Sequence, residues 1–97
     1  MELSYTKLTD KELASGLAAL KGWSVVDGMV QRAFSFDSYK AGLVFASAVG
    51  WAADGLNHHP DIIIGYQKVV VRTVTHDAGG ITSYDLELAK RVDSLAG

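Results

Sequence analysis

A chain of 97 residues is long enough for one domain with an apolar core and too short for two, so we expect a single domain over residues 1–97. The absence of cysteine excludes disulfide bonds, thiolate metal sites and cysteine nucleophiles, and it fits a cytoplasmic protein. The net charge of −2 and the scattered lysines and arginines predict no direct nucleic-acid binding, and the N-terminus has no signal-peptide character.

The first predicted element is a helix near the N-terminus. Thr9 and Glu12 have the spacing of a capping box, in which each side chain accepts a hydrogen bond from the other residue's backbone N–H. Leucines then recur at helical spacing, as Leu13, Leu17 and Leu20. Gly22 is expected to end the helix, because glycine readily adopts the left-handed conformation found after helices.

A β-hairpin is predicted next. Residues 23–26 and 29–36 flank Asp27-Gly28, the strongest short-range hairpin signal. Apolar residues of the second strand alternate onto one face, where Arg32 is the odd member. We expect this second strand to be an exposed sheet edge that requires protection by another subunit.

A second helix is predicted from Asp37 or Ser38 to about Asp54. Its expected buried side is formed by Tyr39, Leu43, Phe45, Val49 and Ala53. No residue from 41 to 53 is charged, but this stretch is shorter than the roughly 20 residues of a membrane span, so we expect no membrane insertion. The stretch is instead expected to lie in the core or against another subunit.

The second half begins with a loop over residues 55–61, which contains the chain's only proline, Pro60. Residues 62–66 and 68–75 are rich in β-branched side chains and predict a second pair of strands. A glycine-containing loop over residues 77–81 then leads to the third helix.

Thr82 and Asp85 have the spacing of a cap for that third helix. Its inward-facing residues are expected to be Leu86, Ala89, Val92 and Leu95. The resulting order is α-β-β-α-β-β-α. Because hairpins pair antiparallel, we predict an α+β fold with a four-stranded antiparallel sheet and three helices on one face.

Three histidines, His58, His59 and His76, are the residues most suited to chemistry. Pro60 favours extended geometry for His59, so the paired histidines are expected to point apart, one to the floor of a pocket and one to its rim. Adjacent histidines fit a zinc site poorly, so we expect no metal. The residues alone leave open whether the histidines act in general acid–base catalysis or only satisfy polar groups of a loop.

One spacing pattern runs through this region. Asp54 is followed after three residues by His58-His59-Pro60, after five more by Tyr66, after nine by His76 and after eight by Asp85. This pattern resembles the active-site signature of the pterin-4a-carbinolamine dehydratase family, also called the dimerization cofactor family. The flanking segments from Leu13 to Leu95 resemble the family as well, and several elements at fixed spacing are more specific than one short motif.

The resemblance implies a hydro-lyase that dehydrates 4a-hydroxytetrahydropterin to quinonoid dihydropterin in tetrahydrobiopterin recycling. His58 and His76 would form the acid–base pair, while His59 would act on the leaving hydroxyl. The implied substrate-binding set is Asn57, His58, His59, Val74, Thr75, His76 and Asp77. Neither a cofactor nor a metal would be required, because the pterin is itself the substrate.

Four further residues are expected to support this site. By resemblance, Asp85 would orient a histidine, although capping alone could also explain it. Asp54 would either support the site or be a helix-end charge, Pro60 would set the loop, and Tyr66 would pack beneath it. The chain departs from the family at Gly55, Asn57, Ile62 and Tyr84, which affects the expected affinity and rate more than the reaction type.

The resemblance also implies an alternative function. Some relatives stabilise the dimer of a transcription factor, and some inactive ones assist the assembly of other proteins. The intact histidine set favours the enzyme, but the two roles are compatible. We also expect a homodimer or homotetramer, because apolar residues make up 48% of this short chain.

Overall fold

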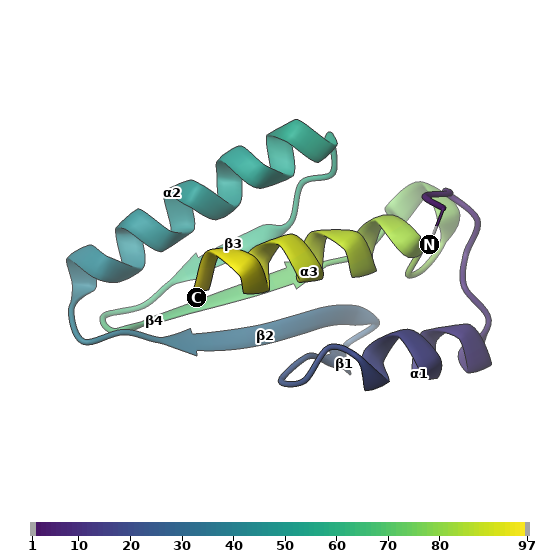
Figure 1. Ribbon diagram of the computed structural model, residues 1–97, viewed down its shortest axis with the longest axis horizontal. Helices are drawn as coiled ribbons and strands as arrows, with labels where there is room; N and C mark the ends of the chain where they lie inside the picture. Colours follow the sequence, from purple (N-terminus) through teal and green to yellow (C-terminus); the bar gives the residue numbers. More distant parts are fainter. Residues whose placement is uncertain (1, 97) are drawn as a thin grey trace.

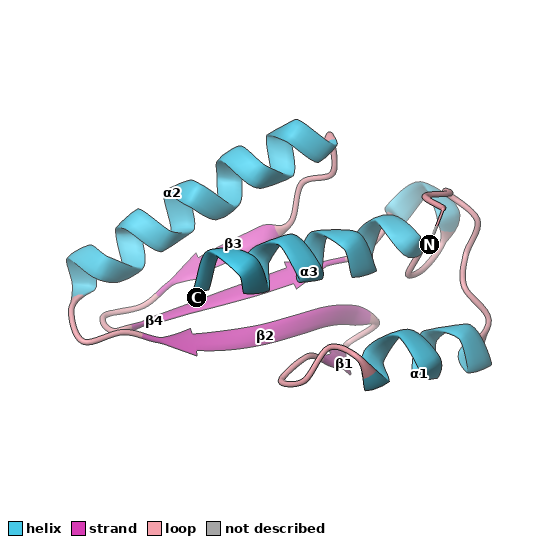
Figure 2. Ribbon diagram, viewed as in Figure 1, coloured by secondary structure: helices cyan, strands magenta, loops and turns pink. Residues whose placement is uncertain are grey.

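The computed structural model describes residues 2–96, which form an α+β fold in the predicted order (Figure 1). The helices are α1 (Asp10–Ala18), α2 (Tyr39–Leu56) and α3 (Ser83–Ala96). The strands are β1 (Ser24–Val26), β2 (Met29–Ser35), β3 (Asp61–Ile64) and β4 (Lys68–Thr73), and a 3-10 turn, η1 (His76–Ala78), follows β4 (Figure 2). The predicted fold class is therefore confirmed.

The four strands form one antiparallel sheet in the order β1-β2-β4-β3. The expectation that β2 is an edge strand is wrong for its first half, since Met29–Gln31 pair with β1 on one side while Val30 and Gln31 pair with β4 on the other. β1 is too short to accompany the rest of β2, so residues 32–35 have only β4 as a partner within the described chain. The full edges of the sheet are β1 and β3.

The apolar core lies between this sheet and the helices α2 and α3, which cross the same face (Figure 1). Val69 and Val71 of β4 are fully buried, as are Val49 of α2 and Leu88 of α3. The alternation of side chains along a strand places Val69 and Val71 on the covered face of the sheet. The spacing of side chains along a helix places Val49 and Leu88 on the sides of α2 and α3 that face this sheet.

Helix α1 begins as predicted and ends earlier. Its capping box is present, with the Thr9 N–H donating to Glu12 Oε1 at 2.9 Å and the Glu12 N–H donating to Thr9 Oγ1 at 3.1 Å. The helix ends at Ala18 instead of continuing to Gly22. Gly22 has φ +91° in the following turn, where an added side chain would meet Arg32 Nε at 2.8 Å. Its role is therefore to allow close approach of the arginine as well as to turn the chain.

Arg32 is the basic exception on the covered face of β2, and Asp93 of α3 explains it. Arg32 Nη1 donates to Asp93 Oδ1 at 2.9 Å, and the same oxygen accepts from Trp23 Nε1 at 2.8 Å. The guanidinium also lies 4.6 Å from the centre of the Phe34 ring. One carboxylate thus joins the first hairpin to the last helix.

Several apolar residues predicted to be buried are exposed. Tyr39, Leu43 and Leu95 are 47%, 39% and 44% exposed, although Phe45, Val49 and Ala53 are buried as expected. Tyr39 lies in the first turn of α2 and Leu95 in the last turn of α3, whereas Leu43 is offset from the buried side of α2 (Figure 1). None of the helices within residues 2–96 combines the length and apolar character needed to cross a bilayer.

Candidate active site

The end of α2 positions the paired histidines. The helix continues to Leu56, and Asn57 then adopts the left-handed conformation at φ 52° and ψ 41°, which asparagine tolerates better than most residues. The Asn57 N–H donates to Asp54 O at 3.1 Å and the His58 N–H to Ala53 O at 3.0 Å. These bonds satisfy the last carbonyls of the helix and set the direction in which the histidines leave it.

The segment after β4 forms the opposite side of the site. Thr75 exchanges backbone hydrogen bonds with Gly80, at 3.1 and 3.3 Å, which closes a tight loop around η1. Gly79 has φ +74° and ends this turn. Because the loop is pinned at both ends, His76 and Asp77 are presented to solvent at the same end of the sheet as His58 and His59.

An open cavity of about 650 Å³ lies between these two segments. Its lining residues include all seven that the resemblance implied for substrate binding: Asn57, His58, His59, Val74, Thr75, His76 and Asp77. The eighth lining residue is Tyr5, from the N-terminal segment. The volume is within the range of small-molecule sites. Segments some 20 residues apart therefore meet as predicted, together with one that was not expected.

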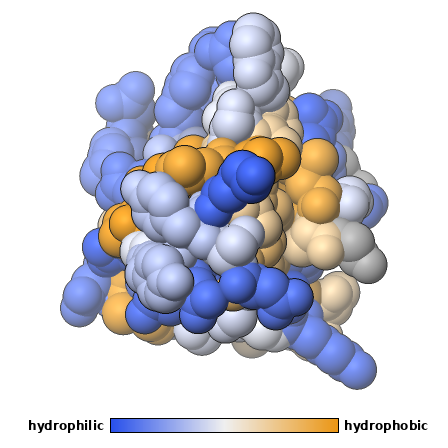
Figure 3. Space-filling view, turned by 90° about the vertical axis from the view of Figure 1, so that its left-hand side faces the viewer, coloured by the Kyte–Doolittle hydropathy of each residue, from blue (hydrophilic) through white to orange (hydrophobic). Residues whose placement is uncertain are grey.

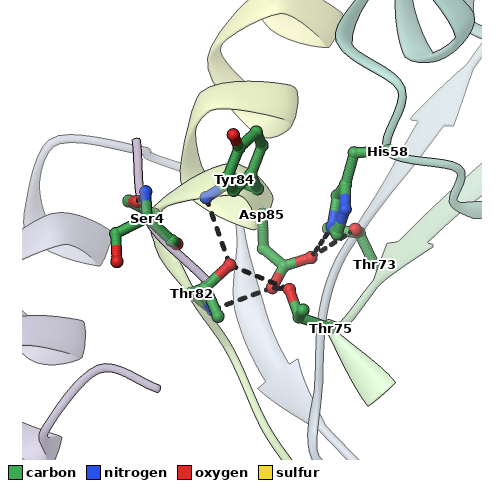
Figure 4. Close-up of polar contacts among 8 residues, drawn as sticks. Ser4, His58, Thr73, Thr75, Thr82, Tyr84 and Asp85 are labelled. Carbon is green, nitrogen blue, oxygen red and sulfur yellow. Dashed lines mark hydrogen bonds and ion pairs between the residues drawn. The ribbon is translucent and has the colours of Figure 1, made fainter. Parts of the chain in front are cut away.

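Asp85 anchors the floor of this cavity and is fully buried. Its Oδ1 accepts hydrogen bonds from His58 Nε2 and Thr73 Oγ1, both at 2.6 Å. Its Oδ2 accepts from Thr75 Oγ1 at 2.8 Å and from the Thr82 N–H at 2.9 Å (Figure 4). Asp85 therefore both caps α3 and holds a histidine, so the two interpretations of this residue are not alternatives.

These contacts select the tautomer of a neutral His58 ring. An ionised carboxylate only accepts hydrogen bonds, so Nε2 of His58 must carry the hydrogen that points to Asp85. In the neutral imidazole Nδ1 then presents a lone pair, and this atom has no hydrogen-bond partner within residues 2–96. His58 is 8% exposed and also lines the cavity. The arrangement can hold a proton acceptor in a fixed orientation at the cavity floor.

His59 occupies a different environment. Its Nε2 lies 3.1 Å from Asp54 Oδ1, and the two side chains are 59% and 72% exposed. The expectation that the paired histidines differ, one at the floor and one at the rim, is confirmed. Asp54 contacts His59 from the last turn of α2, and its supporting role in the site stays a prediction. Such an exposed pair is weak, because solvent screens it.

His76 is exposed at the start of η1, across the cavity from the histidine pair. Within residues 2–96 no three His, Cys, Asp or Glu side chains are grouped so that they could hold a metal ion. The three imidazoles thus surround the cavity without converging on one point, an arrangement that suits proton transfer at separate atoms of a flat ligand.

The position predicted for Tyr66 is wrong, whereas Pro60 lies where it was expected. Tyr66 is 75% exposed in the turn between β3 and β4, because β3 ends at Ile64. That turn lies at the opposite end of β3 from the histidine loop, so Tyr66 cannot pack beneath the loop. Pro60 directly precedes β3, where it limits the chain to extended geometry.

Sequence reasoning missed Tyr5, Thr73 and one of the contacts of Thr82. Thr73 carries a detectable signal, since it is a polar residue in phase with Val69 and Val71 on a buried strand face and so requires a buried partner. Thr82 was recognised as a cap, but its side chain also lies 2.8 Å from Thr75 Oγ1. Tyr5 has no comparable signal, because only the path of the chain brings it to the cavity.

The fold and the cavity can be compared with known proteins. A family model described as pterin 4 alpha carbinolamine dehydratase matches residues 6–95. The chain belongs to the pterin-4a-carbinolamine dehydratase family. Proteins of Sulfurisphaera tokodaii and Natronomonas pharaonis, both named provisionally as pterin-4-alpha-carbinolamine dehydratases, are each 47% identical to it. The alignments cover 92% and 93% of this chain and 96% of each relative.

Two solved structures of the pterin dehydratase type resemble the fold. A transcriptional coactivator/pterin dehydratase from Brucella melitensis superposes with a TM-score of 0.89 at 32% identity, over 95% of this chain and 100% of that one. A pterin dehydratase-like protein identified as a RuBisCO assembly factor in the alpha-carboxysome gives a TM-score of 0.63 at 26% identity, over 77% and 87% of the two chains. Proteins with this fold are therefore named both for dehydratase activity and for a role in the assembly of another protein.

Proposed function

We propose that this protein is a hydro-lyase that converts 4a-hydroxytetrahydropterin into quinonoid dihydropterin and water, as in tetrahydrobiopterin recycling. One observation carries the proposal. Three histidines surround a single cavity in a member of the pterin-4a-carbinolamine dehydratase family, and a buried carboxylate fixes one of them at 2.6 Å. An alternative that used the histidines only as loop polar groups would not require a fully buried carboxylate behind His58.

The reaction moves two protons and breaks the bond between C4a and its hydroxyl oxygen. A base removes the proton from N5, the N5 electron pair forms a double bond to C4a, and the C4a hydroxyl leaves with a proton from an acid as water. In our proposal His58 Nδ1 and His76 act as this acid–base pair, while His59 binds the leaving hydroxyl. Imidazole suits both roles near neutral pH, because both of its protonation states are accessible there.

No electron leaves or enters the pterin in this balance. The proposed reaction therefore requires no redox cofactor, and with imidazoles as the acid and the base it uses no metal. The pterin is its only substrate. Backbone and side-chain groups of Asn57, Val74, Thr75 and Asp77, which line the cavity, would meet the polar edge of the ring. Thr75 would contribute packing surface instead of hydrogen bonds, because its hydroxyl is bonded to Thr82 and Asp85 and its N–H and C=O are bonded to Gly80.

The decisive test is stopped-flow absorbance of 4a-hydroxytetrahydropterin decay, with the wild-type protein and His76→Ala measured in parallel. We expect the wild type to accelerate decay well above the spontaneous rate and His76→Ala to lose about 100-fold in kcat. Tyr66→Ala, an exposed substitution outside the cavity, is the control and should match the wild type. A wild-type protein that leaves the spontaneous rate unchanged would contradict the proposal.

A second role, protein association, is favoured by the exposed surface of α2. Val44 and Trp51 are 66% and 77% exposed, and because they are seven residues apart they lie on the same side of α2. Figure 3 views the left-hand end of the molecule in Figure 1 and shows orange, apolar residues exposed among blue, hydrophilic ones. We propose that α2 contacts another subunit or a protein partner, which fits the homodimer or homotetramer expected from composition.

Light scattering after size-exclusion chromatography tests this second role. We expect a mass of at least twice that of the 10.4 kDa chain, and we expect Val44→Glu to lower it, because a buried unpaired carboxylate weakens an interface by several kcal/mol, roughly. Lys40→Glu, a charge change on the same helix, is the control. A monomeric wild-type protein would contradict self-association through α2, and a different protein would then be the expected partner of this helix.

A further inference from the structure

The N-terminal arm, defined here as residues 4–8, is fastened to the start of α3. The Ser4 N–H donates to Ser83 Oγ at 2.8 Å, and Ser83 Oγ donates to Ser4 O at 3.2 Å. Further along, the Leu8 N–H donates to Ile81 O at 2.9 Å. Ser83 is only 3% exposed, so the arm is held by a buried group at one end and by backbone at the other.

This attachment places Tyr5 against Tyr84. Their ring centres are 4.2 Å apart and the planes differ by 14°, so the rings are stacked. The Tyr84 ring in turn lies 5.7 Å from the His58 ring, with the planes tilted by 37°. Figure 4 shows Tyr84 above Asp85, near both Ser4 and His58. The rings of Tyr5, Tyr84 and His58 therefore form a row, in which Tyr5 and His58 line the cavity and Tyr84 contacts both of them.

Tyr5 remains open to a ligand. It is 55% exposed although one face of its ring is covered by Tyr84, and it lines the same cavity as the three histidines. The adjacent Tyr84 side chain raises the pKa of the Tyr5 phenol. Tyr5 thus keeps its phenolic proton, and remains a neutral hydrogen-bond donor, at the pH values at which imidazoles exchange protons.

From these contacts we propose that Tyr5 is a ligand-positioning residue that extends the active site into the N-terminal arm. The proposal rests on the pterin function proposed above. A flat heterocycle in the cavity would contact the exposed part of the Tyr5 ring, and aromatic pairs prefer such close packing. Because Tyr84 and Ser83 already hold Tyr5 in place, the ligand does not have to immobilise a free side chain. Tyr5 takes no part in proton transfer, so its effect belongs to binding.

The test compares Tyr5→Ala, Tyr5→Phe and Ser83→Ala with the wild-type protein. One measurement is the Kd for oxidised pterin, which keeps the flat ring and does not react, from quenching of pterin fluorescence. The other is KM and kcat for 4a-hydroxytetrahydropterin. We expect Tyr5→Ala to raise both Kd and KM about fivefold, with a much smaller change in kcat. Tyr5→Phe keeps the ring and should retain most of the affinity.

Ser83→Ala separates the arm from the ring itself. It removes both hydrogen bonds to Ser4 and leaves Tyr5 unchanged, so we expect about a two- to threefold rise in Kd from the loosened arm. Tyr39→Ala, on α2 and outside the cavity, should leave Kd and KM at the wild-type values. Circular dichroism melting curves show whether each variant is folded.

Two results would overturn the inference in different ways. If the wild type binds pterin and accelerates dehydration while folded Tyr5→Ala shows the same Kd and KM, then Tyr5 has no positioning role and the proposed function stands. If the wild type neither binds pterin nor accelerates dehydration, the proposed function itself is wrong, and this role of Tyr5 with it.

Discussion

Asp85→Asn is expected to lower the free energy of unfolding by about 3 kcal/mol and to reduce kcat by about 100-fold or more. The carboxylate accepts four hydrogen bonds in a fully buried position, two at each oxygen. An amide keeps the shape, but its NH₂ group must face two donors that have lost their acceptor. The resulting buried polar groups without partners account for the loss of stability.

The loss of activity has a separate cause. With asparagine behind it, His58 can turn its Nε2 lone pair to the amide NH₂ and present Nδ1–H to the cavity, which is the wrong tautomer for a base. Thermal unfolding measures the first effect, for which a shift of more than about 10 °C is expected in a domain of this size. Stopped-flow kinetics on the folded fraction at low temperature measures the second.

Asp93→Asn is the matched control for Asp85→Asn. It makes the same chemical change on the same helix, but Asp93 is partly exposed and contacts Trp23 and Arg32 instead of the cavity. We expect a smaller loss of stability, about 1 kcal/mol, and unchanged kcat. Equal loss of stability from the two substitutions, or wild-type kcat in Asp85→Asn, would show that the buried carboxylate is not essential to the site.

His58→Gln is expected to reduce kcat by about 100- to 1000-fold, whereas His59→Gln should reduce it by about tenfold. His58 is buried and held by Asp85, so water cannot take over the role of a missing ring there. His59 is exposed, so water can partly replace its ring. Glutamine retains a donor for Asp85 in one variant and for Asp54 in the other, which limits structural damage. The two substitutions are therefore matched in chemistry and differ in environment.

The measurement is kcat for 4a-hydroxytetrahydropterin dehydration, corrected for the spontaneous reaction. The unfolding curve of His58→Gln must show a single folded state at the assay temperature. If His59→Gln lost more activity than His58→Gln, the exposed histidine would be the principal proton carrier, and the role assigned to the Asp85–His58 pair would be wrong.

Much of the site was predictable because its residues lie at the ends of strongly patterned elements. The Asp27-Gly28 turn, the β-branched strands and the Thr9–Glu12 cap each indicate an element locally, and their order predicts the fold. The spacing from Asp54 to Asp85 then identifies the polar residues that the fold brings together. For this reason all seven residues implied for substrate binding line one cavity, while their binding of a pterin stays a prediction.

The errors arise where position depends on how far neighbouring elements extend. β1 has three residues and β2 has seven, so only half of β2 is an edge. β3 ends at Ile64, and Tyr66 therefore falls in an exposed turn. Leu95 has the right helical phase for burial, but no neighbour extends far enough to cover it. Periodicity predicts the face on which a residue lies, not whether another element reaches it.

The amino-acid sequence by itself determined the α+β order, the capping signals, the histidine set and the family, since these depend on neighbours along the chain. Only the tertiary structure decided that Asp85 holds His58 while capping α3, that Thr73 completes its shell, and that Tyr5 reaches the cavity. Those contacts join residues from separate elements, and the geometry that brings them within hydrogen-bond distance exists only after the sheet and helices pack.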